Sequence, residues 1–264
     1  MTSKIILFVI ILVLVLCFIF KYSIFNYKES FPNNPKVILI TRFSILDCDT
    51  ESFRLTKYTN KCHDIKKKLF NKTRLENKFM AFKNITYPSI AHQTYKNYEW
   101  WIFTSDMLPP EYLRLLENII TSSYTTINKI KIIPVKNMSS FFKLTDMKLK
   151  KVSKKTNYIS LRIDDDDGLS PYFLKNLIKY KDKSGSIISF PNGMKVKIEN
   201  GKIVFGEKTK SKNIASAGLA AVNKNIYKCG NHTKVDKKYN VIYDNLENAY
   251  IQFCSEFTDT KRKF

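Results

Sequence analysis

Arg162-Ile163-Asp164-Asp165-Asp166-Asp167 places four carboxylates in a row at the end of a predicted β-strand. Two carboxylates about 4 Å apart repel by roughly 4 kcal/mol at an effective dielectric constant of about 20, so solvent, a basic side chain or a metal ion has to offset such a run. Side chains alternate along an extended segment, so Asp164 and Asp166 are predicted to point the same way. We expect them to share one hard divalent cation.

Predicted strands and helices alternate along the chain around this run. Short, apolar, β-branched segments predict buried strands at residues 37–40, 100–104, 131–135 and 158–163. Apolar residues at helical spacing predict helices at residues 69–91, 109–120 and 170–178, with a polar loop at residues 42–64. This order predicts an α/β fold with a mostly parallel sheet flanked by helices. In such sheets ligands bind beyond the carboxyl ends of the strands, where Arg42, Asp106 and the acidic run are expected to gather.

The pattern changes from about residue 186. Short apolar segments at 187–190, 195–198 and 203–205 are predicted strands, and Glu199-Asn200-Gly201-Lys202 supplies a hairpin turn between the last two. A smaller antiparallel C-terminal part is therefore predicted.

The N-terminus carries a candidate membrane anchor. Residues 5–20 are all apolar and are bracketed by Lys4 and Lys21, and counting across Lys21 to Phe25 gives enough length to span a bilayer. A cleaved signal peptide is the competing interpretation, although no small-x-small cleavage site follows Phe20. The predicted organisation is an anchor at residues 1–25, a linker at 26–35 and one globular domain at 36–264. Basic residues flank the apolar segment on both sides, so its orientation stays open.

Cysteines and glycosylation acceptor triplets favour a lumenal, ER- or Golgi-like location for the domain. Four cysteines lie outside the anchor: Cys48, Cys62, Cys229 and Cys254. This even number allows one or two disulfides, although reduced cysteines in the core explain it equally well. Four Asn-x-Ser/Thr triplets begin at Asn71, Asn84, Asn137 and Asn231. An Asn-rich chain also produces such triplets by chance.

The formal net charge of +22 raises the question of nucleic-acid binding. Arginine supplies six of the 45 basic residues, and the lysines are spread along the whole chain beside abundant Asn and Ile. This pattern indicates a compositional bias with lysines on solvated faces, so no nucleic-acid partner is predicted. Attraction to anionic lipid headgroups or anionic sugar nucleotides remains compatible with it.

Several segments taken in order resemble a known family. In GT-A glycosyltransferases a helix end leads into the second strand, and this chain has a segment that resembles it: Pro88-Ser89-Ile90-Ala91-His92-Gln93-Thr94-Tyr95-Lys96-Asn97-Tyr98-Glu99-Trp100. The metal-binding D-x-D strand end of these enzymes is resembled by a second segment: Arg162-Ile163-Asp164-Asp165-Asp166-Asp167-Gly168-Leu169-Ser170-Pro171. Further matching segments are Thr41-Arg42-Phe43-Ser44, Phe190-Pro191-Asn192-Gly193, His232-Thr233 and Tyr250-Ile251-Gln252. Over residues 36–257 the chain is most similar to the rhamnosyltransferase-like family of that fold.

The resemblance implies a metal-dependent glycosyltransferase that moves a hexosyl or deoxyhexosyl group from a nucleotide-sugar donor to a glycan, protein or lipid acceptor. Mn²⁺ or Mg²⁺ would stabilise the departing diphosphate. Aligned on the family's motif, Asp166 would be the main metal ligand, Asp164 would face the ribose or the metal, and Asp167 would orient water or the acceptor. The residues implied to line the nucleotide-sugar pocket are Arg42, Asp106, Arg162, Asp164 and Asp165.

The chain departs from the family in its C-terminal segment. After Tyr250-Ile251-Gln252 the family carries a histidine, whereas this chain has Cys254-Ser255-Glu256. His232 is therefore the nearest substitute for a third metal ligand. The general base is open among Asp244, Glu207 and Glu247, of which we take Asp244 as the candidate.

Two other functions compete with this one. Asp165-Asp166-Asp167-Gly168-Leu169 approximates the motif of haloacid-dehalogenase-like phosphatases, which would use Asp165 and Asp167, but the motif's Thr is missing and the segment lies mid-chain. A non-enzymatic basic membrane-anchored protein would explain the charge and the apolar N-terminus. It would leave the acidic run unexplained.

Overall fold

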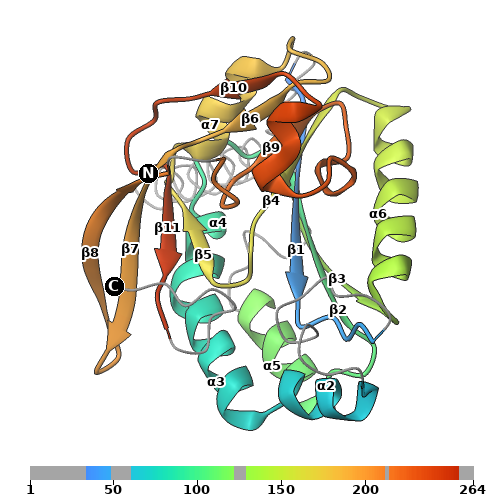
Figure 1. Cartoon of the computed structure of the whole chain (residues 1–264), viewed down its shortest axis with the longest axis vertical. Helices are drawn as coiled ribbons and strands as arrows, with labels where there is room; N and C mark the ends of the chain where they lie inside the picture. Colours follow the sequence, from blue (N-terminus) through green and yellow to red (C-terminus); the bar gives the residue numbers. More distant parts are fainter. Residues whose placement is uncertain (1–33, 49–60, 122–128, 212–213, 256–264) are drawn as a thin grey trace, which may run out of the picture. The chain divides into compact units, whose positions relative to one another are not determined.

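The computed structural model describes residues 34–48, 61–121, 129–211 and 214–255 (Figure 1). The predicted anchor at residues 1–25 and most of the predicted linker lie outside the described residues. Within the described part of the chain, no helix combines the length and apolar character needed to cross a bilayer.

These four predicted strands lie side by side and form one half of a seven-stranded sheet. They are β1 (Lys36–Phe43), β2 (Tyr98–Ser105), β3 (Ile130–Val135) and β4 (Tyr158–Arg162), and they are joined by β6 (Ile187–Ser189), β9 (Ala220–Val222) and β10 (Val241–Tyr243). The strand order is β10-β6-β9-β4-β1-β2-β3. β9 alone in this sheet runs antiparallel to its neighbours, β4 and β6. The predicted α/β fold with a mostly parallel sheet is confirmed.

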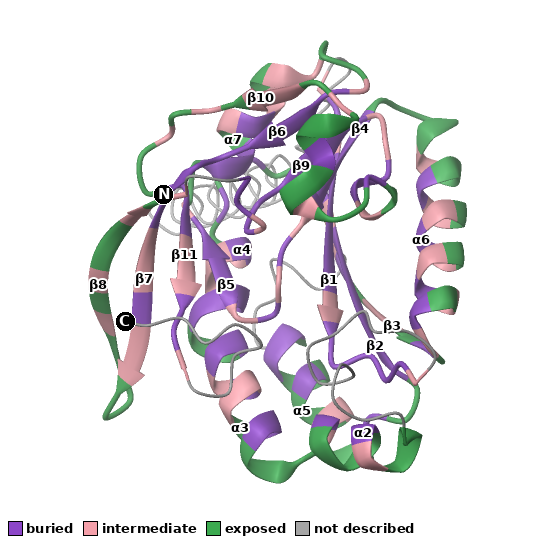
Figure 2. Ribbon diagram, in the orientation of Figure 1, coloured by how far each residue is buried: buried purple, intermediate pink, exposed green. Residues whose placement is uncertain are grey.

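Helices cover both faces of this sheet, which explains the unbroken apolar runs in its strands. Val37 and Leu39 pack with α3 (Lys72–Ala81), α5 (Pro110–Thr121) and α7 (Phe173–Leu177), whereas Ile38 and Ile40 pack against α6 (Met138–Ser153). Figure 2 shows the consequence, with β1 and β4 buried along most of their length and the outer side of α6 exposed. Successive residues of β1 therefore serve two different cores.

The helices differ from the predicted ones in three places. The helix predicted over 69–91 is several elements, namely α2 (Cys62–Leu69), α3, a π-helical turn η2 (Phe82–Thr86) and α4 (Tyr87–Ala91). Asn71 breaks it because its side chain caps α3, accepting a hydrogen bond from the Arg74 backbone N–H at 3.1 Å. α2 occupies part of the predicted polar loop. α6 was not predicted, and Asn137 caps it in the same way through the Ser140 N–H at 2.9 Å.

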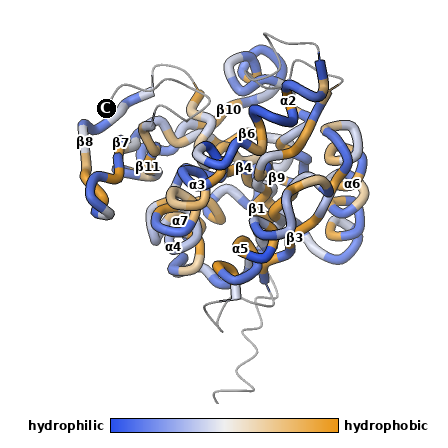
Figure 3. Tube along the Cα trace, turned by 90° about the horizontal axis from the view of Figure 1, so that it is seen from below, coloured by the Kyte–Doolittle hydropathy of each residue, from blue (hydrophilic) through white to orange (hydrophobic). Residues whose placement is uncertain are grey.

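The predicted smaller antiparallel C-terminal part is present only in part. The predicted hairpin is present as β7 (Asn192–Glu199) and β8 (Lys202–Lys210), but β11 (Tyr250–Phe253) pairs parallel with β7 and antiparallel with β5 (Asp167–Leu169). Meanwhile β6, β9 and β10 complete the main sheet. Figures 1 and 3 show the four-stranded sheet β5-β11-β7-β8 to one side of the main sheet. The Tyr250 ring crosses Gly193 so closely that a Cβ there would lie 2.2 Å from it, so this pairing requires glycine.

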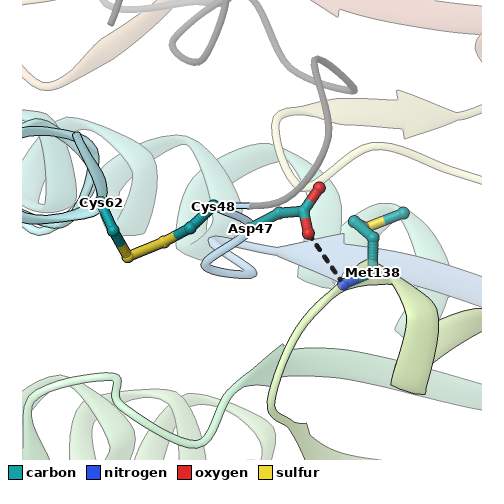
Figure 4. Close-up of a disulfide and its surroundings, with 4 residues drawn as sticks. All are labelled: Asp47, Cys48, Cys62 and Met138. Carbon is teal, nitrogen blue, oxygen red and sulfur yellow. Dashed lines mark hydrogen bonds between the residues drawn. A yellow bond between two sulfur atoms is a disulfide. The ribbon is translucent and has the colours of Figure 1, made fainter. Parts of the chain in front are cut away.

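One disulfide closes the segment that follows β1. Cys48 is bonded to Cys62 at the start of α2, and the neighbouring Asp47 accepts a hydrogen bond from the Met138 backbone N–H at 3.4 Å (Figure 4). Cys229 and Cys254 are buried thiols that take no part in a disulfide. Of the alternatives left open by the sequence, the structure therefore has one disulfide and two reduced cysteines among the described residues.

Candidate functional site

The acidic run connects the two sheets. It leaves β4 of the main sheet, and its last member, Asp167, is the first residue of β5 in the second sheet. The backbone N–H of Ile163 donates to the Ile40 carbonyl of β1 at 3.2 Å, which fixes where the run begins. The four carboxylates thus lie at the carboxyl edge of β4, as the sequence predicted.

Two of the four carboxylates are paired with basic side chains. Arg162 lies 3.3 Å from Asp164. Lys78 of α3 contacts both oxygens of Asp165, at 2.5 and 2.6 Å, and the Asp165 side chain is only 4% exposed. Asp165 is therefore held by a basic side chain of the protein itself, and its place in the nucleotide-sugar pocket stays a prediction.

Asp166 and Asp167 lie in a different electrostatic environment. Burial raises the pKa of Asp166 well above its usual value, and the charge of Asp167 raises it further, while Lys78 opposes both. Asp167 is completely buried in β5, so its predicted contact with water or an acceptor would need this strand end to open. An added cation near Asp166 would relieve the repulsion between these carboxylates.

A basic cluster lies beside the run. Arg42 at the end of β1 and Arg162 at the end of β4 both lie over the ring of Tyr227, with their guanidinium carbons 5.3 and 5.8 Å from its centroid. Burial disfavours the charge of Arg162, but Asp164 and Tyr227 more than compensate, so the pKa of Arg162 is raised. Two predicted pocket residues, Arg42 and Arg162, are thus brought together.

His232 belongs to the same neighbourhood. It is the first residue of the 3₁₀ helix η6 (His232–Lys237), and its pKa is lowered by burial and by the charge of Arg162, while Asp164 acts in the opposite direction. The described residues contain no group of three or more His, Cys, Asp or Glu side chains placed to hold a metal ion. Asp164, Asp166 and His232 do not form a finished three-ligand centre.

Asp106 and the candidate bases lie apart from this cluster. Asp106 is exposed after β2, two strands from β4, which corresponds to about 10 Å across the sheet. Asp244 follows β10, three strands from β4, and accepts hydrogen bonds from the Tyr180 hydroxyl at 2.8 Å and the Leu246 N–H at 2.7 Å. Glu207 is exposed on β8, and Glu247 accepts a hydrogen bond from Asn192 at 3.3 Å.

Sequence reasoning missed two residues of the cluster. Lys78 is one of many lysines and Tyr227 lies in a short 3₁₀ turn, η5 (Ile226–Lys228), so neither carries a local signal. Both reach the site through long-range packing.

Comparison with known proteins identifies the family. The profile of a family described as "Putative rhamnosyl transferase" matches residues 36–264. The chain belongs to this family. The predicted family and the predicted enzyme class, a glycosyltransferase, are therefore confirmed, and this assignment covers the whole domain predicted after the linker.

The rhamnosyl transferase domain is also similar to solved structures of TarS from S. aureus. TarS 1-349 in complex with UDP-GlcNAc is 14% identical with a TM-score of 0.43, covering 84% of this chain and 59% of that one. TarS 1-349 is 13% identical (TM-score 0.40, 83% and 60%), and a further TarS structure is 13% identical (TM-score 0.43, 83% and 37%). The chain thus spans at most about three-fifths of the length of these proteins. A search of the curated proteins found no match.

Proposed function

We propose that this chain is a metal-dependent glycosyltransferase that transfers a sugar from a nucleotide-sugar donor to a glycan, protein or lipid acceptor. The observation that carries the proposal is the position of the acidic run, at the carboxyl edge of β4 beside Arg42 and Arg162, in a chain of the rhamnosyl transferase family. Carboxylates and guanidinium groups side by side can bind a cation and a diphosphate together.

Asp166 is the proposed main ligand of Mn²⁺ or Mg²⁺, with Asp164 as its partner. The donor set fits a hard divalent cation because it offers carboxylate oxygens and because burial and Asp167 already disfavour the anionic form of Asp166. When bound, such a cation supplies positive charge to the departing diphosphate. His232 is proposed to contact the metal or the diphosphate.

Arg42 and Arg162 are the proposed diphosphate ligands. Guanidinium groups form paired hydrogen bonds to phosphate oxygens and keep their charge at all physiological pH values. Asp106, at the carboxyl edge of β2, is proposed to contact the nucleoside end of the donor, which is long enough to extend across neighbouring strands.

Asp244 remains the proposed general base. Its carboxylate is half-buried and held by the Tyr180 hydroxyl, so it is oriented by the protein. A general base has to lie within hydrogen-bond reach of the attacking hydroxyl, so Asp244 can act only if the reacting carbon of the donor is bound on the β10 side of the acidic run.

The proposed setting is a membrane-anchored, lumenal enzyme. The Cys48–Cys62 disulfide supports an oxidising compartment. Peptide mapping of the full chain from a eukaryotic host, without reduction, tests this: we expect a peptide pair linked through these two cysteines, and fully alkylated Cys48 and Cys62 would contradict the location.

The function is tested by incubating the purified full chain with a panel of nucleotide sugars and Mn²⁺ and measuring nucleotide release. Asp166→Asn is expected to lower turnover roughly 100-fold or more, since it removes a metal ligand. Asp182→Asn, at an exposed loop position, is the matched control and should leave turnover unchanged. Undiminished turnover in Asp166→Asn would remove the metal assignment.

No observation favours the phosphatase alternative. Its nucleophile would be Asp165, whose two oxygens are occupied by Lys78, and its acid would be the fully buried Asp167.

A further inference from the structure

Tyr227 contacts both arginines of the site. Its ring lies under both guanidinium groups, at 5.3 Å for Arg42 and 5.8 Å for Arg162. Cations over an aromatic ring are attracted by its negative face, and two like-charged groups that share one ring need that attraction to stay close. The two guanidinium groups therefore share one aromatic ring.

The tyrosine is itself held firmly from several sides. Its hydroxyl donates to the Ile40 carbonyl of β1 at 3.2 Å, the same carbonyl that accepts the Ile163 N–H at the start of the acidic run. Phe141 of α6 packs edge-on against the ring, with centroids 4.9 Å apart. The position of the ring is thus tied to β1 and α6.

The turn that carries Tyr227 is fastened to β4. The Ser160 hydroxyl donates to the Lys224 carbonyl at 2.6 Å and accepts from the Ile226 N–H at 2.9 Å. Asn225 accepts the Tyr227 backbone N–H at 3.1 Å. Tyr227 is consequently a fixed point common to β1 and β4, the two strands that supply the arginines.

We propose that Tyr227 is a positioning residue that holds Arg42 and Arg162 at the spacing needed to bind the two phosphates of the donor. The role rests on the proposed function and extends it to a residue that touches neither the reacting bond nor the metal. Two pre-oriented guanidinium groups lose less freedom on binding a diphosphate than two mobile ones, so the expected contribution is to donor affinity.

Binding of inorganic pyrophosphate to the full chain in detergent with Mg²⁺, followed by isothermal titration calorimetry, tests the role. Tyr227→Leu removes the ring and is expected to weaken binding about 10-fold, as the loss of two cation–π contacts predicts. Tyr227→Phe keeps the ring and loses the hydroxyl, so about a 3-fold loss is expected. Tyr239→Leu is the matched control, because it removes a ring from under Lys224 outside the arginine pair, and it should bind like the wild type.

A double-mutant cycle separates positioning from a general structural effect. If Tyr227 acts through Arg42, the loss in Tyr227→Leu/Arg42→Gln should be clearly smaller than the product of the two single losses. Multiplicative losses, or a Tyr227→Leu variant that binds pyrophosphate like the wild type, would overturn the positioning role and leave the proposed function standing. A wild-type chain that binds no pyrophosphate would contradict the proposed function itself. Thermal unfolding of each variant, with Tyr227→Phe as the milder change, shows whether any loss reflects misfolding.

Discussion

Two acidic regions lie at opposite ends of the strands of the main sheet, and the pKa of the carboxyl group is shifted in opposite directions in the two. Near the amino end of β2, Glu99 accepts hydrogen bonds from Lys36 at 2.5 Å, Lys131 at 2.9 Å and the Trp101 indole at 2.9 Å, contacts from three adjacent strands. Burial alone would raise the pKa of Glu99, but these donors lower it to about 2. At the carboxyl edge of β4, burial and Asp167 raise the pKa of Asp166 instead.

The difference separates a carboxylate that stabilises the fold from one kept for binding. Glu99 has its positive partners built in, so its charge is favourable in the folded state. Asp166 sits among like charges that the protein offsets only in part, through Lys78 and Arg162. Such incomplete compensation is common where a ligand supplies the missing charge.

The largest expected difference between the two carboxylates is in their effect on glycosyl transfer. Asp166→Asn should reduce glycosyl transfer roughly 100-fold or more, whereas Glu99→Gln should change turnover less than about 2-fold, because Glu99 lies at the opposite edge of the sheet. Steady-state rates with the best donor of the panel measure both. Equal losses in the two variants would abolish the distinction.

The next effect is on stability and concerns the buried pair of Lys78 and Asp165. Lys78→Met leaves a buried carboxylate without its cation and should lower the free energy of unfolding by about 3–5 kcal/mol. Urea unfolding at pH 7 measures it. The double variant Lys78→Met/Asp165→Asn should recover a large part of the loss, and no recovery would mean that the pair's charge is not what matters.

A pH-dependent effect is expected at Glu99. A carboxyl group whose pKa is depressed in the folded state stabilises above its unfolded pKa of about 4.5, and this stabilisation disappears as the pH falls toward 2. Glu99→Gln should therefore be less stable than the wild type by at most about 3 kcal/mol at pH 7. Unfolding curves between pH 7 and 2 should converge, and a gap that persists at pH 2 would refute the electrostatic origin.

The smallest effect is expected at Asp166 itself, with the opposite sign. An acid whose pKa is raised by folding destabilises the folded state once it is ionised. Asp166→Asn should therefore stabilise the metal-free chain at pH 7, by about 1 kcal/mol, which is the usual size of the gain when an unfavourable group of a functional site is replaced. The gain should vanish below about pH 4, where the wild-type group is protonated in both states. Thermal unfolding in chelator measures it, and a destabilised variant would contradict the comparison.

The sequence was informative where local pattern controls the structure. Val37 and Ile38 are both buried, in two different cores, as expected for an apolar strand between two helical layers. The acidic run lies at a strand end, as its position after Tyr158-Ile159-Ser160-Leu161 predicted. The helix α6 could have been found as well, since Asn137 is a cap and Met138, Phe141 and Leu149 repeat at helical spacing.

The sequence was uninformative where chain segments meet only after folding. Lys78 and Asp165 are 87 residues apart, and nothing in either segment selects the other. The distance of Asp244 from the acidic run depends on β10 joining the edge of the main sheet beside β6, a pairing of two three-residue strands that local propensity does not determine.

Manganese binding tests the central claim most directly. Electron paramagnetic resonance of the full chain titrated with Mn²⁺ in the presence of pyrophosphate should detect a bound ion in the wild type and in Glu99→Gln, and should lose it in Asp166→Asn. An Asp166→Asn chain that binds Mn²⁺ as tightly as the wild type would contradict the account.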